Sequence, residues 1–182
     1  LSLRFQANGK QYQTYSMSFS EPWLGGKKPI NFEVSLQHTV YRVARFNNFY
    51  QSSAGSGVNY GGGYYNTGIT LSVGRRLKEP DRYLVLTHSL SYQRYRLNDL
   101  DIFRIGYSNG ISNNISFNTT ISRNTLSDFQ FPRSGSNISL SATFTPPYSV
   151  FRINDYKDIA DTYRWVEYNT WMFDSTSYET LP

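Results

Sequence analysis

Side chains that could bind a metal ion are few in this chain and lie far apart. The sequence has two histidines, His38 and His88, and no Cys. Neither histidine has a second ligand at the spacing of the usual zinc patterns. Asp155, Asp158 and Asp161 could suggest calcium, but their segment lacks the Gly and the terminal Glu of an EF-hand loop. We therefore expect no metal and no other cofactor.

Residue types that perform catalysis do not form a recognisable set either. Ser134 follows Arg133 and precedes a single Gly, which is not the nucleophile turn of a hydrolase. The glycines of 55–63 lack the Gly-Lys-Ser/Thr of a phosphate-binding loop. Glu33 and Glu167 are isolated acids within predicted strands. We expect no catalytic residue, and hence a protein that is not an enzyme.

The composition excludes several classes of protein. Aromatic residues make up 17% of the 182 residues, whereas disordered chains contain few of them. No apolar run reaches the ~18 residues of a transmembrane helix. The net charge is +5, and most Lys and Arg residues fall in predicted turns, where they would meet water or anionic lipid headgroups. No basic stripe interleaved with aromatics indicates binding of nucleic acid.

Apolar and polar residues alternate through most of the chain. Within 15–20, 30–37 and 68–74 every second side chain is apolar, and this period of two is typical of β-strands. The pattern predicts an all-β fold of antiparallel strands connected up and down. The predicted strands are residues 1–8, about 11–21, 30–42, 64–77, 83–97, 111–123, 136–145 and about 163–173. In the last strand, Thr170 and Met172 compete with Trp171 and Phe173 for the apolar face.

One face of these strands is apolar and the other carries Ser, Thr, Asn and Gln. A soluble β-sandwich shares this alternation with a transmembrane barrel. Strands of about ten residues or more, aromatics near strand ends and the shortage of charge on the polar face favour lipid as the apolar medium. His88 lies on the apolar face and is an objection. The residues expected to face lipid are Tyr15, Met17, Phe19, Ile30, Phe32, Val34, Leu36, Ile69, Leu71, Val73, Leu84, Leu86, Leu90, Ile115, Phe117, Ile121, Ile138, Leu140 and Phe144.

Shorter and longer connections alternate along the predicted sheet. In an up-and-down sheet, alternate connections lie at opposite edges. Transmembrane barrels have short periplasmic turns at one edge and long extracellular loops at the other. We therefore expect the turn at 128–136 to be periplasmic and the loops at 46–63 and 148–161 to be extracellular.

Two segments give the pattern a more specific meaning. Residues 11–23 read QYQTYSMSFSEPW, and residues 123–136 read RNTLSDFQFPRSGS. Both resemble the BamA family of outer-membrane β-barrel assembly factors, the first a strand entering a periplasmic turn and the second a turn ending in Pro-x-x-Gly-Ser. The family-motif turn would include Phe131, Pro132, Gly135 and Ser136. Residues 163–168, YRWVEY, resemble the strand that follows in the family.

The resemblance implies a function that the residues alone do not show. Residues 1–182 would be part of one outer-membrane barrel domain of about sixteen strands, an internal piece of a longer protein with POTRA repeats before it. The barrel would fold and insert other β-barrel proteins. Its partners would be outer-membrane lipids and lipopolysaccharide, unfolded outer-membrane proteins and other subunits of an assembly complex. A two-partner-secretion or TamA-like translocation pore and a soluble β-sandwich binding module remain alternatives.

Overall fold

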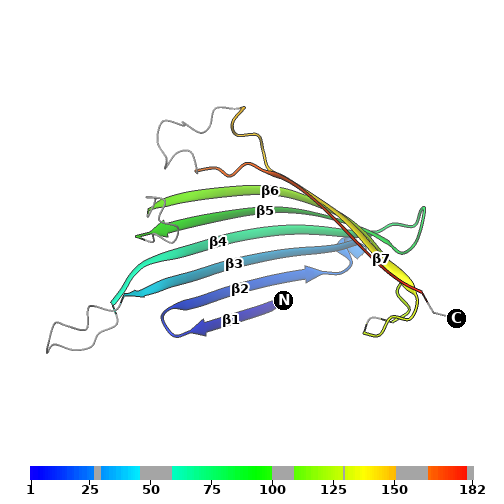
Figure 1. Cartoon of the computed structure of the whole chain (residues 1–182), viewed down its shortest axis with the longest axis horizontal. Coiled ribbons are helices and arrows are strands. Elements are labelled where there is room, and N and C mark those ends of the chain that lie inside the picture. Colours follow the sequence, from blue (N-terminus) through cyan, green and yellow to red (C-terminus); the bar gives the residue numbers. More distant parts are fainter. Residues whose placement is uncertain (27–29, 46–58, 100–108, 129, 151–163, 180–182) are drawn as a thin grey trace.

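The structure is a single curved antiparallel sheet with strands in sequence order (Figure 1). It is a computed structural model that describes residues 1–26, 30–45, 59–99, 109–128, 130–150 and 164–179. The order β1-β2-β3-β4-β5-β6-β7-β8 confirms the predicted all-β, up-and-down fold. None of the described residues lies in a helix with the length and hydropathy of a membrane span.

Most strand boundaries lie within a few residues of the predicted ones. The strands are β1 (Ser2–Asn8), β2 (Tyr12–Glu21), β3 (Ile30–Arg45), β4 (Asn59–Arg76), β5 (Leu84–Asn98), β6 (Gly110–Asn124), β7 (Gly135–Phe144) and β8 (Asn169–Tyr178). A short 3-10 turn, η1 (Leu24–Gly26), follows β2. Gly9, in the Asn8-Gly9 hairpin signal, has a φ of 56°, which a glycine adopts without steric cost.

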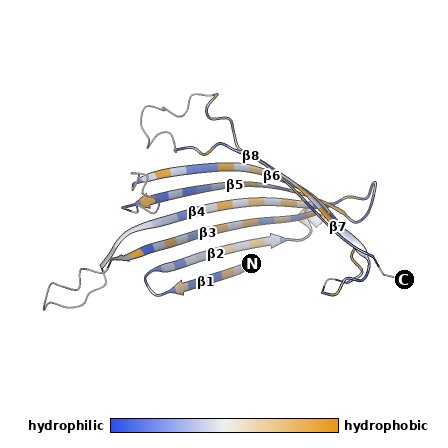
Figure 2. Cartoon of the chain, viewed as in Figure 1, coloured by the Kyte–Doolittle hydropathy of each residue, from blue (hydrophilic) through white to orange (hydrophobic). Residues whose placement is uncertain are grey.

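The register aligns apolar residues of neighbouring strands on one face. Directly paired residues in an antiparallel sheet point to the same side. One such row runs Phe19, Val34, Leu71, Leu90, Phe117 and Phe144, from β2 to β7. Each residue between these rows points to the other face, so that the two faces differ in chemistry along the whole sheet. Figure 2 shows this alternation as hydrophobic and hydrophilic bands along the strands.

The prediction for the eighth strand was wrong in its position. β8 begins at Asn169 rather than near residue 163, because residues 164–168 make other backbone contacts. Trp165 pairs in parallel with Asn113 of β6. The backbone N–H of Tyr168 donates to the Thr145 hydroxyl at 2.7 Å. Residues 164–168 therefore form a segment that lies against the start of β6 and the residue that follows β7. In β8 proper, Trp171 and Phe173 share the apolar face with Ala142 and Leu140.

The predicted loop at 46–63 also extended too far. β4 starts at Asn59, and its first residues pair with the end of β3 across an irregularity between Arg42 and Ala44. Three consecutive glycines, 61–63, hide the alternation there, since they have no side chain to display it. Residues 46–58 and most of the loop at 148–161 lie outside the described residues.

Very few of the described side chains are buried. The buried hydrophobic residues are Val40, Ala142 and Tyr148. No second sheet packs on the described strands, whereas a sandwich buries one face of each sheet against the other. The apolar face of this single layer is instead exposed, for example at Leu71, Leu90 and Phe117.

Candidate functional site: two faces and a turn

The apolar face forms a continuous belt across the sheet. By register, all the residues expected to face lipid point to this side, and Leu3, Phe5, Trp171 and Phe173 join them. Leu90 in the middle of the sheet is 47% exposed. Soluble monomers rarely expose apolar patches of more than a few hundred Å², and a larger patch marks a contact with a membrane or another protein. Contact with lipid stays a prediction.

His88 interrupts this belt but has a partner on the same face. Its Nδ1 lies 3.0 Å from the hydroxyl of Thr119, the residue directly opposite it on β6. The imidazole also stacks on the Phe117 ring at 5.7 Å between ring centroids. A polar group in an apolar medium is tolerated when it is hydrogen-bonded. The pairing with Thr119 therefore answers the objection that His88 raised against lipid contact.

The opposite face, which we call the hydroxyl face, is lined by short polar side chains that bond across the strands. Thr120 and Ser141 lie 2.8 Å apart between β6 and β7. Asn118 donates to Thr143 at 2.8 Å in the next row. Side chains that bond to one another in this way form a neutral, hydrophilic wall that can face water. Glu33 belongs to this face, by register with Ser20 and Ser72, and stands alone as a potential charge in its row on β2–β6.

The turn between β6 and β7 is held together by backbone and hydroxyl groups. Thr125 and Ser136 bond reciprocally: the Thr125 N–H donates to the Ser136 carbonyl at 2.8 Å, and the Ser136 N–H donates to the Thr125 hydroxyl at 3.0 Å. Farther out, the Ser127 hydroxyl accepts the N–H groups of Arg133 and Ser134. The chain thus forms a closed, hydrogen-bonded tongue rather than an open loop.

The four family-motif residues have different roles in this tongue. Gly135 has a φ of 103°, and a Cβ at that position would lie 2.2 Å from the Thr125 carbonyl oxygen. Only glycine fits there. Ser136 supplies the bonds to Thr125, and Pro132 is half-buried. Phe131, in contrast, is 81% exposed at the tip. Its aromatic ring has the position of a contact residue rather than a packing residue.

An ion pair connects this turn with the turn between β4 and β5. The Nε of Arg123 donates to a carboxylate oxygen of Asp81 at 2.6 Å, and Arg123 also reaches the Ser136 hydroxyl at 3.5 Å. The backbone N–H of Tyr83 and the Arg123 guanidinium lower the pKa of the Asp81 carboxyl from its ordinary value. Sequence reasoning placed Arg123 in a strand and Asp81 in a turn without connecting them, because no sequence pattern relates residues so far apart.

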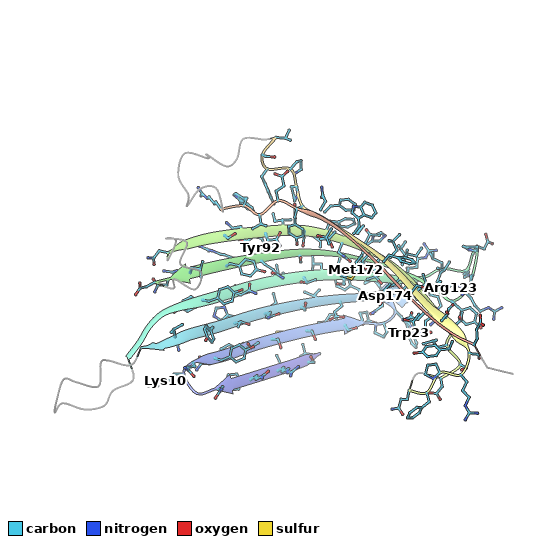
Figure 3. The ribbon with its side chains drawn as sticks, in the orientation of Figure 1. Lys10, Trp23, Tyr92, Arg123, Met172 and Asp174 are labelled. Atoms are coloured by element: carbon cyan, nitrogen blue, oxygen red, sulfur yellow. The ribbon has the colours of Figure 1, made fainter. Side chains whose placement is uncertain are left out.

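The two ends of the sheet differ, as Figure 3 shows. Lys10 lies at the end where β1 turns into β2, and Trp23 and Arg123 lie at the opposite end. The tongue at 124–136 and the Asp81–Arg123 ion pair are therefore at one end, which we call the turn end. The loops at 46–58 and 100–108 connect strands at the other, the loop end.

No arrangement of the described side chains suggests a metal site. His38 and His88 lie on different strands, each bonded to a threonine, and no cluster of three potential ligands occurs in the described part of the chain. The trio Asp155, Asp158 and Asp161 lies outside the described residues. Glu167 accepts hydrogen bonds from the backbone and the hydroxyl of Ser149, which is a structural role in the connection to β8.

An up-and-down sheet with one apolar belt and one hydroxyl face has the architecture of the wall of an outer-membrane β-barrel. The comparison with protein families agrees. The chain matches the model of the Omp85 superfamily domain over residues 1–179, and it therefore belongs to that superfamily. Members of the superfamily are outer-membrane barrel proteins that assemble or translocate other proteins and are not enzymes. No curated protein matches the chain.

Proposed function

We propose that residues 1–182 form part of the barrel of a BamA-like assembly factor, which folds and inserts β-barrel proteins into the outer membrane. The observation that carries the proposal is a change in the height of the apolar belt. On β5 the belt includes Leu84, Leu86, Leu90 and Tyr92, with His88 between them. On β2 it is reduced to the three residues Tyr15, Met17 and Phe19, and on β4 to Ile69, Leu71 and Val73.

The two short stretches of the belt end in a charge, Arg75 on β4 and Glu21 on β2. Glu21 is the next residue of β2 on the apolar face, paired directly with Phe32. The apolar stretch on β2 spans five residues, or about 17 Å along the strand, and that on β5 spans nine, or about 30 Å. Hydrocarbon next to a short belt must thin to match it, at fractions of a kcal/mol per Å. A bilayer thinned beside these short stretches would lower the barrier for an incoming β-hairpin.

A test of this mechanism lengthens the belt on β2. Glu21→Leu in the full-length protein adds one apolar position, about 7 Å of belt along the strand, and should slow the insertion of a substrate barrel into lipid vesicles about fivefold. Glu33→Leu removes the same charge from the hydroxyl face and should change the rate by less than twofold. Insertion is measured by the change in gel mobility of the substrate barrel when it folds. An unchanged rate for Glu21→Leu would reject the belt as the source of activity.

The orientation of the barrel is part of the proposal. The turn end would face the periplasm and the loop end the cell exterior, as the short and long connections suggest. In intact cells, a membrane-impermeant maleimide should label Lys10→Cys but not Ser134→Cys in the full-length protein. Labelling of Ser134→Cys alone would show that the barrel has the opposite orientation. After the cells are opened, both positions should react, which controls for accessibility.

A translocation pore of the same superfamily is the second candidate, and the hydroxyl face favours it. A wall of short polar side chains with few charges offers an extended polypeptide few strong contacts and would let it pass. The full-length protein in a planar bilayer distinguishes the two functions. Conductance that an unfolded polypeptide blocks, without any insertion of substrate barrels into vesicles, would favour translocation over assembly.

A further inference from the structure

A groove crosses the apolar face from β1 to β4 near the loop end. Its volume is about 540 Å³, within the ~300–1,000 Å³ of small-molecule sites. Two transverse rows of side chains form its walls. The wall nearer the loop end is Phe5, Tyr15, His38 and Thr67, which are directly paired across the strands. The other wall includes Leu3, Met17 and Leu36, the next row on the same face.

The groove is open because the residues between its two walls point their side chains to the opposite face. These residues form its floor and include Gln37 and Gly68, whose side-chain positions point to the hydroxyl face. The groove is therefore a trough between two ridges. The Phe5 and Tyr15 rings are 5.0 Å apart between centroids, and His38 is hydrogen-bonded to Thr67 at 2.8 Å. These contacts hold the wall nearer the loop end in place.

Two cations lie beside the end of this trough. Arg94 is directly opposite Thr67 on β5, and Arg96 is directly opposite Tyr65, in the next row toward the loop end. Both side chains are exposed and point to the apolar face. No ion pair joins either arginine to an acid within the described residues. A mostly apolar trough, a histidine–threonine pair and two unpaired arginines thus follow one another along the face.

We propose that the trough and the two arginines bind one molecule of lipopolysaccharide through its lipid A part. An acyl chain would lie between the two ridges, and phosphates would bond Arg94 and Arg96. Arginine suits phosphate because its planar guanidinium donates two parallel hydrogen bonds. The proposal rests on the proposed orientation, which places the loop end in the outer leaflet. Lipid A carries two phosphates, one for each arginine, and one of its several acyl chains would occupy the trough.

The test measures binding of purified full-length protein in detergent to fluorescent lipid A and, separately, to phosphatidylglycerol. Each arginine near an anionic lipid surface contributes about fivefold to binding, so Arg94→Gln with Arg96→Gln should weaken lipid A binding about 25-fold. Arg76→Gln, on the hydroxyl face, is the matched control and should change binding less than twofold. Arg94→Lys with Arg96→Lys keeps the charge but loses the parallel hydrogen bonds, and its affinity should lie between those of the original protein and the double Gln variant.

The trough is tested separately from the charges. Leu36→Trp fills it and should weaken lipid A binding severalfold, whereas Leu71→Trp, on the same face but outside the trough, should not. Heat-dependent gel migration shows whether each variant has folded. Unchanged lipid A binding in the double Gln variant or in Leu36→Trp would overturn the proposal, as would equal or tighter binding of phosphatidylglycerol.

Failure of this proposal and failure of the proposed function have different signatures. Lipid A binding that depends on Arg94 and Arg96, in a protein without insertion activity, would leave the lipid site standing and reject the assembly function. Normal insertion activity without binding of lipid A would reject the lipid site and leave the assembly function standing.

Discussion

The two faces of this sheet share one set of backbone ladders but satisfy their side chains in different ways. On the hydroxyl face, Thr120 and Ser141 bond directly across the strands at 2.8 Å, and similar pairs recur along it. On the apolar face, paired residues such as Leu71 and Leu90 stay 39% and 47% exposed despite contact with each other. The side chains of the hydroxyl face thus satisfy their hydrogen bonds with one another and with water, whereas those of the apolar face need an external apolar medium. The difference between the faces is tested by adding a charge to each of them. It is tested further by removing the partner of a polar side chain within the belt and by straining the turn between β6 and β7.

The largest expected effect comes from adding charge to each face in turn. Leu71→Arg or Leu140→Arg places a charge in the belt, which costs about 2–4 kcal/mol at the bilayer midplane of a barrel. Ser72→Arg and Ser139→Arg put the same side chain on the hydroxyl face, where it stays hydrated. Yields of folded full-length protein in the outer membrane should fall for the first pair only. Equal yields for both pairs would reject the assignment of the faces.

A glycine at the turn end should be far less replaceable than one on the hydroxyl face. Gly135→Ala strains a residue with φ of 103° and brings its Cβ against the Thr125 carbonyl, which we expect to destabilise the barrel by about 1–3 kcal/mol. Gly74→Ala is the control, because its Cβ would meet only Thr87 and Asn31 at 3.6 Å and 3.9 Å. Urea unfolding of the protein in vesicles measures both. A Gly135→Ala variant as stable as Gly74→Ala would contradict the role of the motif.

The polar pair within the belt should behave as a unit. Thr119→Val leaves the His88 imidazole without its partner in an apolar medium and should cost about 1 kcal/mol. Adding His88→Phe removes the unsatisfied group and should restore most of that loss. The same unfolding measurement applies to both variants. If the double variant were less stable than Thr119→Val, the pair would have a role beyond mutual hydrogen bonding.

The smallest expected effect concerns the ion pair at the turn end. The pKa of Asp81 is lowered in the folded protein, so its contribution is present above its ordinary value of 3.8 and is lost as the pH falls toward the lowered value. The amides of Leu77 and Leu84, which close this turn, should therefore exchange a few-fold faster at pH 3 than at pH 6, after correction for intrinsic rates.

Asp81→Asn should remove this pH dependence and open the turn at pH 6 by a similar factor. Glu79→Gln, a charge removal in the same turn, serves as the control and should retain it. An identical pH response in Asp81→Asn would show that another group controls the opening of the turn.

The sequence by itself determined the local properties of this protein. Alternation with a period of two depends only on neighbouring residues, so the strands and the two faces could be predicted wherever side chains display the period. It failed at Gly61–Gly63, which have no side chain to display the period. It also failed at 164–168, where the period is present but the backbone pairs with Asn113 and Thr145 instead of a neighbouring strand. The sequence of residues 123–136 predicted a turn, which lies between β6 and β7, although only the structure shows why Gly135 must be glycine.

Tertiary structure decided everything that depends on register. Which strand positions oppose one another set the His88–Thr119 pair, the Asp81–Arg123 ion pair and the row that places Arg94 beside Thr67. A shift of one residue between strands would move every side chain to the opposite face, and no local pattern contains that information. The belt therefore follows from the sequence, whereas the trough across β1–β4 arises only when the strands are aligned.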